Sequence, residues 1–248
     1  MAIARVGTSQ FSEASGVTTR ALTVTPGAVG NMLLVGASVG VGSTVTLSIA
    51  DTALNTWVPV HPLTHQATTN NVTYASWLAI ANGTSSTTVT VTSSSSNFMI
   101  MSLEEFSGTT ATPTDQVVAS ADGASGSAPI SPSMTPTADD ELVWAWCADN
   151  LTGVGNIDGS AATAGGNGPT YSGGDGTEFR VLTGRSGVAM TAAFVGSGGN
   201  YTLMAATFKP ATTQAFTINV GLGNLVAHGW NYDRFKVMRN NAKVVIGR

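Results

Sequence analysis

The sequence predicts an all-β protein, an antiparallel, jelly-roll-like β-sandwich built from two similar halves, with a C-terminal β-hairpin segment. Three observations predict it. Thr, Val, Ile and aromatic residues alternate with polar residues in short runs, which is the period of a β-strand. Gly, Ser, Asn and Pro separate these runs, as turns require. No stretch carries an apolar stripe of helical period over three turns.

The expected strands follow one another along most of the chain. The runs that show the alternation, each closed by turn residues, are 21–27, 32–43, 44–51, 72–83, 87–96, 98–108, 141–149, 177–184, 188–196 and 201–210. The run 98–108, "FMIMSLEEFSG", also has the composition of a short helix, but its Ser- and Asn-rich approach and its Ser-Gly exit favour a strand. Residues 151–176 are rich in Gly and longer than a usual connection, so they predict a loop that varies or makes contacts.

The chain repeats itself at long range. Residues 22–40, "LTVTPGAVGNMLLVGASVG", resemble residues 132–149, "PSMTPTADDELVWAWCAD", in a Thr-Pro turn, a short polar link and an apolar strand. Residues 77–108 resemble residues 179–210 in an aromatic strand, a Gly turn, a second strand and a closing strand opened by Asn and an aromatic residue. The spacing is too long for a solenoid, so it indicates a duplicated β-unit.

This duplication predicts two halves, about 1–112 and 113–210. Each half either supplies one set of strands to a single sandwich or forms a small sandwich by itself. The short link between the halves, and the size that single β-domains reach, favour one sandwich.

Charge is sparse and unevenly placed. Charged residues make up 10% of the chain, against about 25% in an average soluble protein. Residues 1–208 hold four basic and thirteen acidic side chains, a net charge of −9, whereas residues 209–248 hold six basic and one acidic, a net charge of +5. A basic segment on an acidic body suggests a docking element.

Residues 211–248 are therefore predicted to be a separate docking segment. The stretch "RFKVMRNNAKVVIG" reads as a hairpin whose Asn240 and Asn241 suit a tight turn. Aromatic and basic residues interleave before and within it, and the candidate partner contacts are Trp230, Tyr232, Arg234, Phe235, Lys236 and Arg239. Such interleaving also fits single-stranded nucleic acid, but the acidic body argues against that partner.

The chain gives no sign of export, membrane insertion or disulfide stapling. The opening "MAIARVGTSQF" lacks a basic segment followed by an apolar one, and no apolar run approaches the about 20 residues that span a bilayer. We therefore expect a protein that is made in the cytoplasm and does not insert in a membrane. Cys147 is the one cysteine, which excludes an intramolecular disulfide, and its apolar neighbours predict a buried, inert thiol.

Residues Gly36 to Gly40 spell G-x-S-x-G, the pattern of a hydrolase nucleophile elbow. That elbow needs a strand, a sharp turn and then a helix. Here another strand-like run, "VGSTVTLSIAD", follows Ser38. The pattern also arises easily in a chain with 29 glycines. We therefore interpret Ser38 as part of an ordinary strand and predict no catalytic residue.

No metal or cofactor site is expected either. His61 and His65 have a zinc-like spacing, but Pro59 and Pro62 exclude a helix, so we interpret both histidines as solvated loop residues. The other candidates are also given structural roles. Asp149, Asp158 and Asp175, which could bind calcium, are interpreted as turn residues, Glu104 and Glu105 as opposite faces of one strand, Asp139, Asp140 and Glu141 as a solvated acidic turn, and Gly221 to Gly223 as a turn.

The tryptophans are divided between core and surface. Trp144 and Trp146 share one face of a strand, together with Leu142, so we expect them in the core rather than on a glycan platform. Trp230 is the tryptophan that we expect to be an exposed contact.

Three motifs resemble a β-sandwich type found in virion proteins of tailed phages. They are "GNMLLVGASV", "DTALNTWVPV" and "FSGTTATPTDQ", and they occur in that order within about the first 120 residues. The matching positions are Gly30, Asn31, Leu33 to Val35, Asp51, Asn55, Trp57, Phe106 to Gly108, Asp115 and Gln116. The resemblance implies a jelly-roll-like or immunoglobulin-like sandwich that forms homo-oligomers on a capsid, tail or fibre, and it implies no catalytic residue.

The function expected from these observations is that of a non-enzymatic virion structural protein, a capsid decoration or head-fibre protein on the particle surface. Its partners would be copies of itself, with a trimer among the options, and other virion proteins such as the major capsid protein. Two alternatives stay open: a tail or receptor-binding component, and a glycan-binding module that uses Trp230, Tyr232 or residues 151–176 against a host surface glycan. A hydrolase using Ser38 is a third class.

Overall fold

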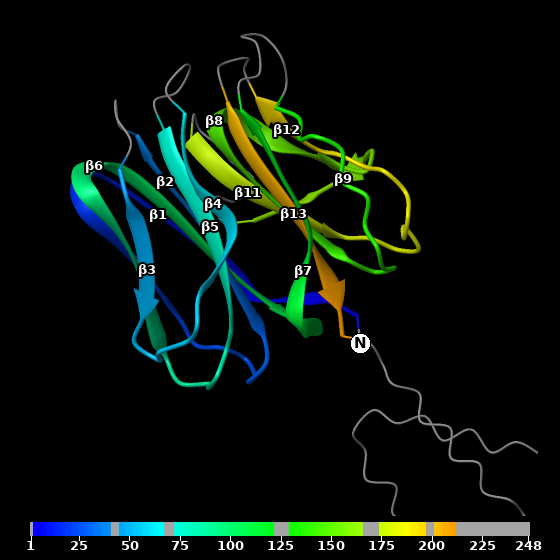
Figure 1. The fold of residues 1–248 in the computed structure, drawn as a ribbon, viewed down its shortest axis with the longest axis horizontal. Coiled ribbons are helices and arrows are strands. Elements are labelled where there is room, and N and C mark those ends of the chain that lie inside the picture. The colour runs from blue at the N-terminus through cyan, green and yellow to red at the C-terminus, as the bar shows by residue number, and fades with distance from the viewer. Residues whose placement is uncertain are drawn as a thin grey trace, which may run out of the picture. The chain divides into compact units, whose positions relative to one another are not determined.

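The predicted β-sandwich is confirmed by a computed structural model of the chain, in which every described element is a β-strand. The structure describes residues 2–40, 45–66, 72–121, 129–165, 174–196 and 201–211. Two antiparallel sheets pack face to face within the compact unit formed by Ala2–Ala211 (Figure 1).

Each sheet comes from one continuous part of the chain. The first sheet has the order β1-β6-β2-β5-β4, with β3 also paired to β6. Its strands are β1 (Ala4–Val24), β2 (Met32–Gly40), β3 (Leu47–Asp51), β4 (Val58–Gln66), β5 (Val72–Ile80) and β6 (Thr87–Ser107). The second sheet has the order β10-β11-β8-β13-β7, with β9 and β12 also paired to β8. Its strands are β7 (Thr109–Ala121), β8 (Leu142–Ile157), β9 (Ser160–Ala161), β10 (Thr163–Ala164), β11 (Gly174–Val181), β12 (Ala192–Gly196) and β13 (Thr202–Pro210).

The two sheets share one design, as the sequence repeat predicts. In the first sheet Met32 of β2 lies opposite Ile80 of β5 and Phe106 of β6. In the second sheet the equivalent strand β8 pairs in the same way with β11 and β13, where Leu142 opposes Val181 and Phe208. The turn before each strand also matches, because Gly30 and Asp140 both have a positive φ, of 90° and 58°.

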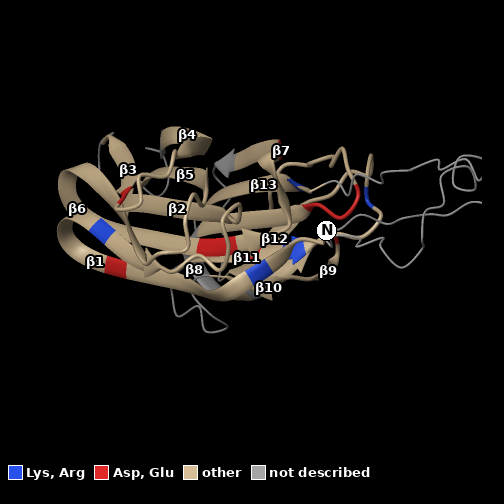
Figure 2. Ribbon diagram, turned by 90° about the horizontal axis from the view of Figure 1, so that it is seen from below, with Lys and Arg blue, Asp and Glu red and all other residues tan. Residues whose placement is uncertain are grey.

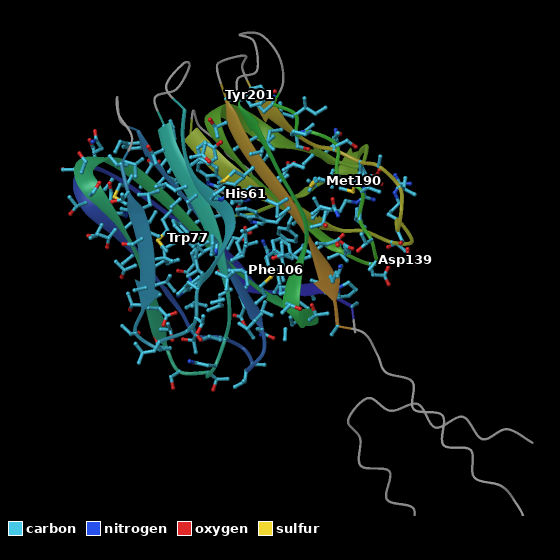
Figure 3. The ribbon with its side chains drawn as sticks, viewed as in Figure 1. His61, Trp77, Phe106, Asp139, Met190 and Tyr201 are labelled. Atoms are coloured by element: carbon cyan, nitrogen blue, oxygen red, sulfur yellow. The ribbon has the colours of Figure 1, made fainter. Side chains whose placement is uncertain are left out.

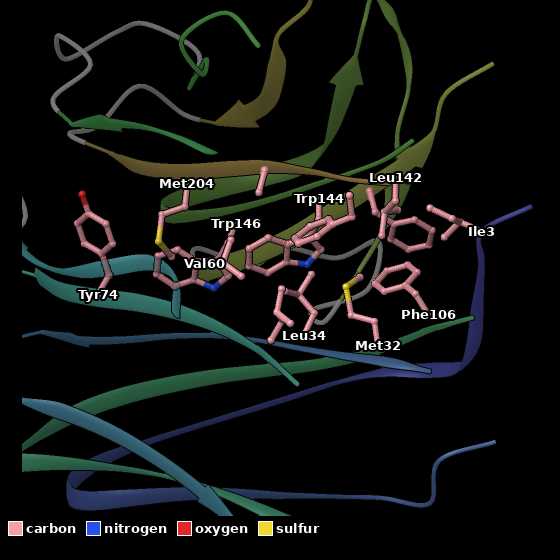
Figure 4. Close-up of a cluster of buried hydrophobic side chains, with 14 residues drawn as sticks. Ile3, Met32, Leu34, Val60, Tyr74, Phe106, Leu142, Trp144, Trp146 and Met204 are labelled. Atoms are coloured by element: carbon pink, nitrogen blue, oxygen red, sulfur yellow. The ribbon is translucent and has the colours of Figure 1, made fainter. Parts of the chain in front are cut away.

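A central core fills the space between the sheets. Trp144 and Trp146 of β8 point toward Met32 and Leu34 of β2 (Figure 4). The predicted core role of these two tryptophans is thus confirmed. Gly36 makes room for them, because a Cβ atom there would lie 3.0 Å from Trp146 Cδ1 and 3.1 Å from Trp144 Cη2.

Each sheet also folds over on its outer side. The long strands β1 and β6 bend. The C-terminal end of β1, the N-terminal end of β6 and β3 together cover the outer face of the first sheet, with residues such as Val89 and Val91. The end of β8 with β12 covers the second sheet in the same way, and Cys147 is buried there, as predicted. The described strands thus form one central sandwich, with a small second layer on each outer face.

Burial on both faces explains the composition of β2. Residues Met32 to Val39 are all buried, so the strand reads as a continuous apolar run and not as an alternation.

Three of the longer strands were not anticipated, and one loop was predicted wrongly. The sequence runs did not identify β4, β7 or most of β1. The predicted loop 151–176 is partly strand, because β8 continues to Ile157 and β9 and β10 follow, while residues 166–173 lie outside the described ranges.

Candidate functional site: polar groups buried between and beneath the sheets

Ser38 lies in the middle of a strand. It belongs to β2, between Tyr74 of β5 and Ile100 of β6, and it is buried. No turn and no helix follow it within β2, so the strand interpretation of the G-x-S-x-G segment is confirmed.

His61 joins the two sheets, so its prediction as a solvated loop residue is wrong. It lies in the edge strand β4 and is buried where the first sheet faces the second (Figure 3). Its Nδ1 is 2.7 Å from Ser76 Oγ in its own sheet. Its Nε2 is 3.0 Å from Val118 O of β7 and 3.1 Å from Ala205 O of β13. Two carbonyl oxygens at Nε2 require that this nitrogen carries a proton and donates across the interface.

Burial sets the protonation of His61. It lowers the pKa of the imidazole from its usual 6.5 to about 4, and the two carbonyl hydrogen bonds offset only part of that shift. Pro59 and Pro62, which argued for a loop, fit an edge strand because its outward N–H groups need no partner.

Glu104 is a second buried bridge between the sheets. Its Oε2 accepts from Trp144 Nε1 at 2.5 Å, and its Oε1 accepts from Thr177 Oγ1 at 2.8 Å. Burial raises the pKa of Glu104, although hydrogen bonds from Thr177, Ser9 and Trp144 oppose the shift. Glu104 of β6 and the Trp144 and Thr177 side chains of the second sheet thus satisfy one another inside the central core.

Glu105 points to the other side of β6, as the alternation predicts. Its Oε1 accepts from Gly27 N at 2.8 Å and from Asn31 Nδ2 at 2.5 Å. The carboxylate therefore holds the turn that leads into β2, and it does not form a pair with Glu104.

The acidic turn at 139–141 is only partly solvated. Asp139 and Asp140 are exposed, but Glu141 is fully buried, which corrects the prediction for that residue. Its Oε1 accepts from Thr137 N at 3.1 Å and from Ala138 N at 2.8 Å. Glu141 therefore supports the turn before β8.

Asp158 lies in a turn, as predicted, and it also forms ion pairs. Its φ is 55°, and its carboxylate contacts Arg185 and, at 4.0 Å, Arg180. Within the described ranges no three His, Cys, Asp or Glu side chains gather as metal ligands. The side chains of Asp149 and Asp175 lie outside the described part.

One turn in the first sheet is built around a single carboxylate. Asp51 Oδ1 accepts from Ala53 N at 2.9 Å and Asn55 N at 3.1 Å, and its Oδ2 accepts from Asn55 Nδ2 at 3.0 Å and Trp57 Nε1 at 2.7 Å. These bonds hold Leu54 at a φ of 57° with its side chain 85% exposed. The motif D-x-x-x-N-x-W, noted in the sequence, is thus the framework of a rigid turn that displays an aliphatic side chain.

The described body contains few charged residues, which Figure 2 shows as separate blue and red segments on a largely uncharged ribbon. The predicted partner contacts Trp230, Tyr232, Arg234, Phe235, Lys236 and Arg239 lie outside the described residues. So do Gly221 to Gly223. The described part of the chain contains no helix that could cross a membrane.

Comparisons of the chain with protein-family models, curated proteins and solved structures find no match. His61 and Glu104 are each hydrogen-bonded to groups of the opposite sheet. Sequence reasoning missed both because their partners are set by how the sheets face each other.

Proposed function

We propose that the chain is a non-enzymatic structural protein of a tailed-phage virion, a capsid decoration or head-fibre protein that assembles on the particle surface. The observation that carries the proposal is the use of buried reactive groups as bridges: His61 and Glu104 tie one sheet to the other. Side chains committed in this way support a rigid body whose role is contact rather than chemistry. The resemblance of three sequence motifs to virion β-sandwiches supplies the setting.

The proposed contacts are with copies of the chain itself and with the major capsid protein. The body offers exposed aliphatic side chains on adjoining turns, Leu54 at 85% and Val29 at 65% exposure. Asn82 links these turns, because its backbone and side chain bond to Asn55 and Ala53 while Ala81 bonds to Gly30 and Asn31. Many copies that bridge neighbouring shell subunits would stabilise the shell by mass action.

The basic segment after Ala211 is the second proposed contact element, with Trp230 and Phe235 as its aromatic anchors. It carries a net charge opposite to that of the body. The protein would be made in the host cytoplasm and would act on the virion.

Sedimentation velocity tests the assembly role. We expect the full chain to sediment as an oligomer, and a chain ending at Ala211, which retains the whole compact unit, to sediment as a folded monomer. A full-length double variant, Trp230→Ala with Phe235→Ala, should also fall to a monomer.

A matched double variant, Val29→Ser with Leu54→Ser, separates the two contact elements. If it leaves the oligomer intact, the tail alone drives self-association and the turns remain free for the shell. If the full chain and the shortened chain are both folded monomers, self-association through the tail is wrong.

A further inference from the structure

Three charged side chains converge at one end of the second sheet. Asp115 lies on β7, Lys209 lies near the end of the neighbouring strand β13, and Glu141 directly precedes β8. Lys209 Nζ is 2.8 Å from Asp115 Oδ1. Thr137 N donates to both acids, at 2.8 Å to Asp115 Oδ2 and at 3.1 Å to Glu141 Oε1, so the two carboxyl groups share a donor and lie side by side.

The two acids are withdrawn from water. The Asp115 side chain is 4% exposed and Glu141 is fully buried, while the Lys209 side chain is 38% exposed. Glu141 Oε2 has no hydrogen-bond partner at bonding distance among the described residues. A buried carboxyl oxygen without a partner, next to an ion pair, is placed to take up or release a proton.

The pKa values of the two acids are shifted in opposite directions. Burial raises the pKa of Glu141, and hydrogen bonds from Thr207 and Ala138 oppose that shift while the neighbouring Asp115 carboxylate adds to it. Burial by itself would raise the pKa of Asp115 too, but hydrogen bonds from Lys209 and Thr137 outweigh it and lower that pKa to about 2. The two acids therefore differ, because the pKa of Glu141 is raised and that of Asp115 is lowered.

The first sheet shows that the turn does not require this arrangement. The equivalent turn is held by one carboxylate, Glu105, which accepts from Gly27 N at 2.8 Å and from Asn31 Nδ2 at 2.5 Å. By strand register, neutral Asn31 occupies the position of Glu141, and Ser107 occupies that of Lys209. The second acid and the lysine are therefore additions specific to the second sheet.

We propose that Lys209 and Asp115 condense to an intramolecular amide bond, with Glu141 as the proton-transfer group. The Lys209 ammonium group loses a proton to the carboxyl pair, and the neutral Nζ attacks Asp115 Cγ. The Nζ–Cγ bond forms, one Cγ–O bond breaks, and the departing oxygen leaves as water with two protons that come from Nζ. Glu141 passes these protons and ends in its starting state, so ammonium plus carboxylate gives amide plus water with no other reactant.

The contact between the Lys209 amine and the Asp115 carboxyl group favours formation of the amide. An amine held in contact with a carboxyl group reacts at an effective concentration far above any in solution. Exclusion of water from Asp115 and Glu141 disfavours hydrolysis of the product. The hydrogen bond to Asp115 raises the pKa of Lys209, so loss of a proton from the ammonium group is the step that Glu141 has to assist. The amide would join β13 to β7 and enclose β8 to β12 in a covalent loop.

Intact mass under denaturing conditions tests the proposal directly. We expect the full chain, after incubation in its folded state, to be lighter than its sequence requires by one water. Proteolysis should yield one branched peptide joining the segments around Asp115 and Lys209. The branched peptide excludes the loss of water by cyclisation at an aspartate, which gives the same mass but no joined peptide.

Variants assign the roles. Lys209→Arg keeps the positive charge and should restore the full mass, whereas Lys236→Arg, the same change elsewhere, should keep the loss of water. Glu141→Gln should slow or abolish the reaction, and Asp115→Asn should lose ammonia instead of water.

A wild-type chain that keeps its full mass, with no branched peptide, would overturn the proposal and leave Lys209 and Asp115 as an ion pair. Loss of water that persists in Lys209→Arg would do the same. Neither result depends on the virion proposal, since the bond forms or fails to form whatever the chain assembles with.

Discussion

At the scale of single residues, Gly36 shows how one missing side chain lets the two sheets approach. Its place on the inner face of β2 is filled by the indole rings of Trp144 and Trp146 from the other sheet. This contact explains why a strand that needs apolar bulk carries glycine there. The G-x-S-x-G pattern is thus a product of packing.

We expect Gly36→Val to lower the free energy of unfolding by about 1–3 kcal/mol, because the new side chain would overlap both tryptophans. Valine otherwise favours strands, so a loss would come from packing alone. Chemical denaturation measures the difference. Gly40→Val is the control on the same strand, since a Cβ atom at Gly40 meets no described atom within 4 Å, and it should leave stability nearly unchanged. Equal effects of the two variants would contradict the packing argument.

At the scale of one element, the turn from Asp51 to Trp57 is held by a single carboxylate. Four hydrogen bonds to Asp51 keep Leu54 in a left-handed conformation that costs a side-chain-bearing residue about 1 kcal/mol. The surrounding bonds offset that cost. The strength of these four hydrogen bonds indicates that the turn is held in one conformation.

We expect Asp51→Ala to lower the free energy of unfolding by about 2 kcal/mol or more, because several donors lose a charged acceptor. Leu54→Gly should leave stability unchanged or raise it by about 1 kcal/mol, since glycine adopts a positive φ freely and the leucine side chain is exposed. Leu63→Gly, at an exposed position without a positive φ, is the control and should be destabilising. Thermal or chemical unfolding of the three variants checks the order, and a destabilised Leu54→Gly would show that the turn is not strained.

At the scale of the whole molecule, stability depends on two buried groups that titrate in opposite senses. Burial lowers the pKa of His61 from 6.5 to about 4, so the unfolded chain binds more protons between these values and stability falls as the pH drops through them. Burial raises the pKa of Glu178 from 4.5 to about 7, so the folded chain binds more protons there and stability falls as the pH rises through that range. Each effect amounts to about 3 kcal/mol.

Two variants separate these effects. Relative to the wild type, Glu178→Gln should gain stability as the pH rises from 4.5 to 7, because the glutamine has no charge to bury. The wild type should gain stability as the pH rises from 4 to 6.5, because the unfolded chain then loses its preference for the His61 proton. His61→Gln has no such group, so its stability should fall relative to the wild type over this range. Unfolding free energies across this pH range give both differences, and the exposed Glu13→Gln is the control. Curves that run parallel to the wild type would show that neither group is titrating as its burial implies.

Local patterns were enough to predict most of the strands and the sandwich, but not the contacts between the sheets. Strands such as β5 and β13 were visible because their β-formers lie between clear turn residues. β4 was missed because Pro59 and Pro62 interrupt it, which only an edge strand tolerates. β1 was missed because Gly7 and Gly16, both with positive φ, break its pattern where it bends.

The partners of the buried polar groups depend on register and on how one sheet faces the other. Nothing near His61 in the sequence indicates the carbonyl groups of Val118 and Ala205. In the same way, Asp115 and Lys209 meet only because β7 and β13 are neighbours. Long-range pairing of this kind is not encoded in local alternation.

The continuity of each sheet along the chain has a consequence for biosynthesis. The first sheet is complete once Ser107 has left the ribosome, since β1 pairs with β6 as far as Ala4 opposite Ser107. At typical translation rates the second half follows over roughly 5–20 s. During that time Met32, Leu34 and Phe106 face solvent instead of the second sheet. A nascent chain of this design exposes an aggregation-prone apolar face to neighbouring chains on a polysome. Slower translation or a lower chaperone concentration should therefore reduce the yield of soluble protein.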